Sequence, residues 1–127
     1  MTSCKRIPLE IQQYISIVRG NEYPSCREQF QLCDFVENVF QTEDIYVDKE
    51  QLADYLSYQK YFPFGLFPWE IFCFALHNCT YRADGTLRFP ILVIYVGRGA
   101  GKNGYLGFED FSLLTKTNGI PEYHIDI

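Results

Sequence analysis

The stretch from Ile91 to Asn103, ILVIYVGRGAGKN, most constrains how this chain can fold. Ile91 to Val96 is a run of six apolar residues, which predicts a fully buried strand. The next segment, Gly97 to Gly101, is rich in glycine and predicts a tight turn. Lys102 follows, and after it the pattern becomes helical. A buried strand, a glycine-rich turn, a lysine and the start of a helix together form the architecture of a phosphate-binding loop.

The residues of this loop predict a nucleotide site with some departures from the usual pattern. Backbone N–H groups and the helix N-terminus would face the phosphates, and Lys102 would place its ammonium against the β- and γ-phosphates. The strict pattern G-x-x-x-x-G-K-[ST] is not met, because Val96 stands at the first glycine position and Asn103 replaces the hydroxyl that binds Mg²⁺. The carbonyl oxygen of Asn103 can still bind a hard cation. The alternative interpretation is a strand that enters a glycine-rich hairpin with an exposed lysine.

Length and composition are typical of one globular domain. The chain has 127 residues, 47% hydrophobic and 17% aromatic, and the aromatic share predicts broad aromatic packing surfaces. The net charge of −5 argues against a general nucleic-acid-binding protein. The five cysteines include no C-x-x-C pair, which favours reduced core thiols over a disulfide framework or a zinc site. No secretion signal is recognisable, and no apolar stretch approaches the ~18 residues of a membrane helix.

Helical patterns dominate the first half of the chain. Residues 1–24 are expected to be only partly ordered, with one side of a short helix lined by Leu9, Ile11, Ile15 and Val18. Ser25, with Glu28 three residues later, predicts the capping box of a helix from Cys26 to about Phe40.

Further elements follow from capping and turn residues. Asp48 is placed to cap a helix that stops near Phe62, and Pro68 is placed as the first residue of the next helix. The helix at Pro68 is apolar nearly all round, so we expect it inside the domain or inside an assembly. Residues 79–89 predict a β-hairpin with Asp84 and Gly85 in its turn.

The C-terminal part predicts a helix and a second strand of the sheet. The helix after Lys102 contains Gly104 and Gly107, each of which costs about 1 kcal/mol relative to alanine. Residues 116–119 end the helix, and Tyr123–Ile127 would begin a strand. The predicted fold class is therefore α/β, an incomplete P-loop NTPase fold. Its N-terminal helices are followed by a β-hairpin and by a strand, P-loop, helix and strand unit.

Several segments together are more specific than the loop alone. They are EDIYVDKEQ (43–51), YQKYFPFGLFPWEIFCFALHNCTY (58–81), DGTLRFP (84–90), VGRGAGKNGYLGFEDFSLLT (96–115) and NGIPEYHIDI (118–127). With these segments the chain resembles the N-terminal part of a tailed-bacteriophage terminase large subunit, the ATPase of the DNA-packaging motor. The resemblance covers most of the chain from about residue 25 onward. It also accounts for the variant Walker A loop, since these subunits commonly carry R-G-x-G-K-N.

The resemblance implies that this chain binds ATP with Mg²⁺. Lys102 would bind the β- and γ-phosphates, Asn103 would lie near Mg²⁺, and Arg98 would stabilise the charge that develops on the transferred phosphoryl group. The phosphates would be cradled by the backbone N–H groups of Gly97, Gly99, Ala100 and Gly101. Without the resemblance, Arg98 would be interpreted as an exposed arginine paired with a carboxylate.

The segment Pro68-Trp69-Glu70 resembles the P-W-Q element that contacts adenine in terminases. Glu70 replaces the glutamine, so the acceptor is kept and the amide donor is lost. The simpler interpretation of Trp69 is a core residue. The two histidines, His77 and His124, are isolated in the sequence and are expected to be structural.

The expected partners are the remaining terminase segments or subunits, including the small terminase and the portal, in the host bacterial cytoplasm. DNA would be contacted only through the full assembly. Asp126 lies one strand too early to be the acid that activates water, and no nuclease segment is recognisable, so we expect no motor-like ATP hydrolysis by this chain alone. The alternatives are a non-catalytic prophage remnant or docking module and, more distantly, a small P-loop kinase.

Overall fold

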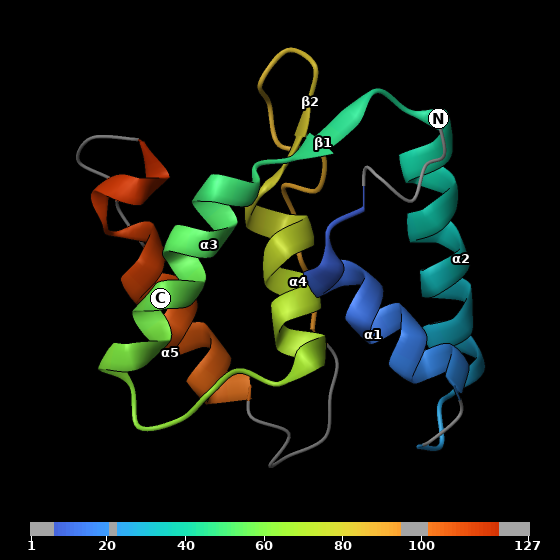
Figure 1. Ribbon diagram of the computed structural model, residues 1–127, viewed down its shortest axis with the longest axis horizontal. Coiled ribbons are helices and arrows are strands. Elements are labelled where there is room, and N and C mark those ends of the chain that lie inside the picture. The colour runs from blue at the N-terminus through green and yellow to red at the C-terminus, as the bar shows by residue number, and fades with distance from the viewer. Residues whose placement is uncertain (1–6, 21–22, 95–101, 120–127) are drawn as a thin grey trace.

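Helices make up most of the computed structural model, which describes residues 7–20, 23–94 and 102–119 (Figure 1). In chain order the elements are α1 (Leu9–Gly20), α2 (Arg27–Thr42), β1 (Ile45–Val47), α3 (Lys49–Ser57), the 3₁₀ helix η2 (Tyr58–Tyr61), α4 (Pro68–Asn78), β2 (Thr80–Arg82), α5 (Lys102–Leu113) and the 3₁₀ helix η3 (Lys116–Asn118). The described residues form a helix-rich α/β structure with a small two-stranded antiparallel sheet.

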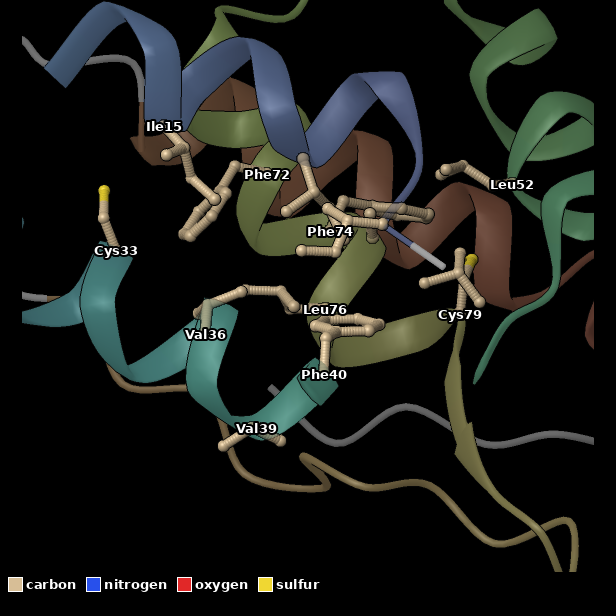
Figure 2. Close-up of a cluster of buried hydrophobic side chains, with 14 of the residues drawn as sticks. Ile15, Cys33, Val36, Val39, Phe40, Leu52, Phe72, Phe74, Leu76 and Cys79 are labelled. Carbon is tan, nitrogen blue, oxygen red and sulfur yellow. The ribbon is translucent and has the colours of Figure 1, made fainter. Parts of the chain in front are cut away.

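Helix α4 lies at the centre of this arrangement, between α1 on one side and α3 and α5 on the other (Figure 1). The ring of Phe72 lies 4.5 Å from the ring of Tyr14 in α1, and the ring of Phe74 lies 5.2 Å from that of Tyr55 in α3. Figure 2 shows side chains of α1, α2, α3 and α4 meeting in one buried hydrophobic cluster. The prediction that the apolar helix at Pro68 lies inside the domain is confirmed.

Local signals set the helix starts largely as expected. The Asp48 side chain accepts a hydrogen bond from the backbone N–H of Gln51 at 3.0 Å, and Pro68 occupies the first turn of α4. The predicted cap of α2 was wrong by one residue. Cys26 is the N-cap, and its backbone N–H donates to the Gln29 side chain at 2.9 Å, so Gln29 takes the role predicted for Glu28.

The sheet contains a pairing that the sequence did not indicate. Strand β1 runs antiparallel to β2, with Tyr46 opposite Tyr81. The predicted turn after β2 is confirmed, because Gly85 has φ +88° and a bridge joins Tyr81 to Leu87. The predicted second strand of the hairpin is reduced to this single bridge at Leu87. The main partner of β2 is instead β1, at residues 45–47.

Residues 91–94 do not form the buried strand that the apolar run predicts. They carry no strand assignment, and Ile91 and Val93 are 81% and 82% exposed. Leu92 and Ile94 are partly buried against the core, so exposure alternates along the segment. A buried strand needs a neighbour on its hydrogen-bonding edge, and no described residue provides one here. Residues 95 and 96 of the run lie outside the described residues.

The helix predicted after Lys102 is confirmed as α5, despite its two glycines. At Gly104 the backbone approaches the Phe64 ring so closely that a Cβ would lie 3.3 Å from it. Gly104 therefore allows close contact between the start of α5 and the side chain of Phe64. The helix ends earlier than predicted, because α5 stops at Leu113 and Lys116–Asn118 form η3. Gly119 follows η3 with φ +77°, a conformation that favours glycine. The predicted strand Tyr123–Ile127 lies outside the described residues.

Candidate functional site

The predicted loop residues are only partly visible in the described structure. Gly97, Arg98, Gly99, Ala100 and Gly101 lie outside the described residues. Lys102 is the first residue of α5, as predicted, but its side chain also lies outside them. Asn103 is exposed in the first turn of the same helix. The free N–H groups of such a turn can bind an anion, so the helix start has the chemistry that a phosphate site needs.

The start of α4 lies beside the start of α5, and both point to the same side of the molecule (Figure 1). The rings of Trp69 and Tyr105 have centroids 6.3 Å apart, and Tyr105 comes three residues after Lys102. Tyr105 also packs against Phe74, a residue of α4 that is buried in the hydrophobic core. The structure therefore brings the proline-tryptophan-glutamate segment and the first turn of α5 together, although they are far apart in the sequence.

Glu70 has a structural role that the sequence analysis missed. It is 3% exposed, and its Oε1 accepts a hydrogen bond from the backbone N–H of Phe67 at 2.7 Å. Burial raises the pKa of this carboxyl group, and the Phe67 hydrogen bond opposes that shift. The glutamate stands three residues after the cap, which is the spacing of a capping box and could have revealed this role. One carboxylate oxygen of Glu70 thus caps the N-terminus of α4. Adenine binding by Glu70 stays a prediction.

A buried polar cluster joins α4 to α5. Asn78 Nδ2 donates to Glu109 Oε2 at 2.8 Å, and the Tyr105 hydroxyl donates to the same oxygen at 3.0 Å. All three residues are at most 9% exposed. Burial, and then the negative charge of Glu109, raise the pKa of Tyr105, so this residue stays a neutral donor. An acidic residue at position 109 looks like an ordinary helix-surface residue, so nothing in the sequence indicated this cluster.

The nearby Cys73 is a free thiol whose pKa burial raises to about 11. A thiol with so high a pKa is a poor nucleophile at neutral pH. Cys26, Cys33 and Cys79 are also free. No group of three or more His, Cys, Asp or Glu residues that could hold a metal occurs within residues 7–20, 23–94 and 102–119. The prediction of Asn103 as a Mg²⁺ ligand is untested, and its exposed amide would supply one neutral oxygen.

Next to the buried cluster, a half-open cavity of about 250 Å³ is lined by His77, Leu92, Ile94, Leu106 and Glu109. His77 Nδ1 lies 2.8 Å from the backbone carbonyl oxygen of Phe89. This contact fixes the ring and ties α4 to the segment that leads to the loop. His77 therefore has the structural contact that its isolation in the sequence suggested. His124 lies outside the described residues.

Comparisons with protein-family models, curated proteins and solved structures found no match to this chain. None of the helices in the described ranges is both long and apolar enough to cross a membrane.

Proposed function

We propose that this chain is the N-terminal fragment of a phage terminase large subunit and binds ATP with Mg²⁺ at the start of α5. In this proposal the backbone N–H groups of the loop and the α5 N-terminus hold the phosphates, and Lys102 pairs with the β- and γ-phosphates. Arg98 would face the transferred phosphoryl group, and Asn103 would lie near Mg²⁺.

One observation carries the proposal. A helix begins at Lys102, and its first turn contacts Trp69, which belongs to the Pro68-Trp69-Glu70 segment that resembles the adenine-contacting element of terminases. A phosphate-binding segment and a base-binding segment must lie close enough for one bound nucleotide to reach both. The 6.3 Å separation of the Trp69 and Tyr105 rings meets this requirement.

A docking module without ATPase activity is the second candidate. It is favoured by the exposure of Ile91 and Val93, because a nucleotide-binding loop is normally held by a buried strand. Two exposed aromatic side chains in contact with each other, Phe111 of α5 and Tyr61 of η2, add to the apolar surface available to a partner.

The test is a titration of the chain with a fluorescent ATP analogue, with and without Mg²⁺. Lys49→Ala is the matched control for Lys102→Ala, because Lys49 is also the first residue of a helix. We expect saturable binding by the wild type and by Lys49→Ala. Binding by Lys102→Ala should be at least about tenfold weaker, the loss expected for one charge-assisted phosphate contact. No saturable binding by the wild type, or equal binding by all three proteins, would contradict the nucleotide site and favour the docking module.

A further inference from the structure

The cavity lined by His77, Leu92, Ile94, Leu106 and Glu109 has a composition that selects one class of ligand. Three of its lining residues are aliphatic and form an apolar wall. The other two, His77 and Glu109, carry polar groups, and each of them can accept a hydrogen bond. Its volume of about 250 Å³ is just below the ~300–1,000 Å³ of typical ligand sites, so it suits a molecule of only a few carbon atoms.

The histidine offers an acceptor. A carbonyl oxygen can only accept, so the 2.8 Å contact to Phe89 requires His77 Nδ1 to carry the hydrogen. In the neutral ring, Nε2 then has a free lone pair. His77 is held in this tautomer by the backbone and not by another titratable group.

The glutamate offers a second acceptor and a charge. Both hydrogen bonds that Glu109 receives, from Asn78 and Tyr105, go to Oε2 and come from neutral donors. Glu109 is only 9% exposed, and none of the described side chains forms an ion pair with it. Buried carboxylates are ordinarily paired with a cation, because burial of an unpaired charge costs several kcal/mol.

We propose that this cavity binds a small organic cation, a primary ammonium group on a short aliphatic chain. The ammonium has three donors, so it can donate to His77 Nε2 and to the Glu109 carboxylate together. The aliphatic chain packs against Leu92, Ile94 and Leu106. An anion of the same size would be repelled by the Glu109 carboxylate. A molecule with only acceptors could not form a hydrogen bond with either His77 Nε2 or Glu109. The five residues that line this cavity are not among those proposed to bind ATP, and the test does not depend on nucleotide binding.

The experiment is an NMR titration of the full chain with n-butylammonium chloride, followed through the Leu and Ile methyl groups and the His77 ring. We expect saturable shifts confined to the cavity residues. Butyrate, which has the same chain with the opposite charge, should cause none of them. The neutral alcohol n-butanol should bind at least about fivefold more weakly than the ammonium. Equal binding by n-butanol and n-butylammonium, or no saturable shift of the cavity residues, would overturn the proposal.

Two variants sharpen the test. Glu109→Gln should weaken n-butylammonium binding about tenfold, while Asp110→Asn makes the same change of charge one residue away, at a position that does not line the cavity, and should bind normally. Leu106→Trp fills the cavity from an exposed position and leaves the polar cluster intact, so it should block binding even if Glu109→Gln does not fold. Normal binding by Leu106→Trp would show that the ligand lies elsewhere.

Discussion

At the scale of single residues, the polar cluster between α4 and α5 gives the clearest prediction. Asn78→Ala removes one of the two donors to Glu109 and leaves a buried carboxylate with a single hydrogen bond. We expect the free energy of unfolding to fall by about 1–3 kcal/mol, the usual cost of an unsatisfied buried polar group. Urea denaturation measures the change.

The matched control for this substitution is Asn38→Ala. Asn38 is an exposed asparagine within α2, so the same side chain is removed from a helix and no buried partner is lost. Its replacement should leave the free energy of unfolding unchanged or slightly raised. Equal effects of the two substitutions would mean that the Asn78 contact to Glu109 does not stabilise the fold.

Glu70 gives a prediction about pH. Its pKa in the folded protein is raised above the 4.5 of the unfolded chain. Between the two values the native state binds more protons than the unfolded state, so stability falls as pH increases from about 4.5 through the folded pKa. Glu70→Gln keeps the acceptor for Phe67 and should remove this part of the pH dependence. Urea midpoints measured from pH 4 to 8 test this. Parallel pH profiles for both proteins would contradict the assigned cause.

At the scale of elements, the two glycines of α5 differ in what surrounds them. A Cβ at Gly107 would meet nothing within 4 Å, so Gly107→Ala should stabilise the protein by about 0.5–1 kcal/mol through helix propensity. A Cβ at Gly104 would lie 3.3 Å from the Phe64 ring, so Gly104→Ala should gain less or lose stability. Thermal denaturation of both variants decides the point. A larger gain at Gly104 would show that the Phe64 ring moves away freely.

Element types and starts followed from local chemistry. The cap at Asp48, the proline at Pro68 and the turn at Gly85 each act within a few residues, so the sequence could reveal them. The pairing of β1 with β2 and the Asn78 contact to Glu109 join residues more than thirty positions apart. Neither residue type nor spacing marks such a pair in advance.

At the scale of the whole molecule, the apolar run at residues 91–96 shows why the central strand could not be predicted reliably. Six apolar residues indicate that burial is favourable, but burial on both faces also requires a second strand and covering elements. In the described structure only Leu92 and Ile94 have such cover. The proposed nucleotide site also depends on such a neighbouring strand, because its loop directly follows the apolar run.

The exposed side of this segment predicts self-association. The double variant Ile91→Thr with Val93→Thr should reduce concentration-dependent association in sedimentation velocity and change the free energy of unfolding by less than about 0.5 kcal/mol. Leu92→Thr with Ile94→Thr, on the covered side, should instead destabilise the protein by more than about 1 kcal/mol. Identical behaviour of the two double variants would contradict the alternation of exposure.

The packing of α1 on α4 has a consequence for synthesis in the cell. Helix α1 ends at Gly20, but α4, against which it packs, ends only at Asn78. At roughly 5–20 residues per second, the ribosome leaves α1 without α4 for on the order of several seconds. During that interval the nascent chain offers an amphipathic helix to chaperones. Codon changes that slow translation between residues 20 and 78 should therefore lower the yield of folded protein more than similar changes after residue 78.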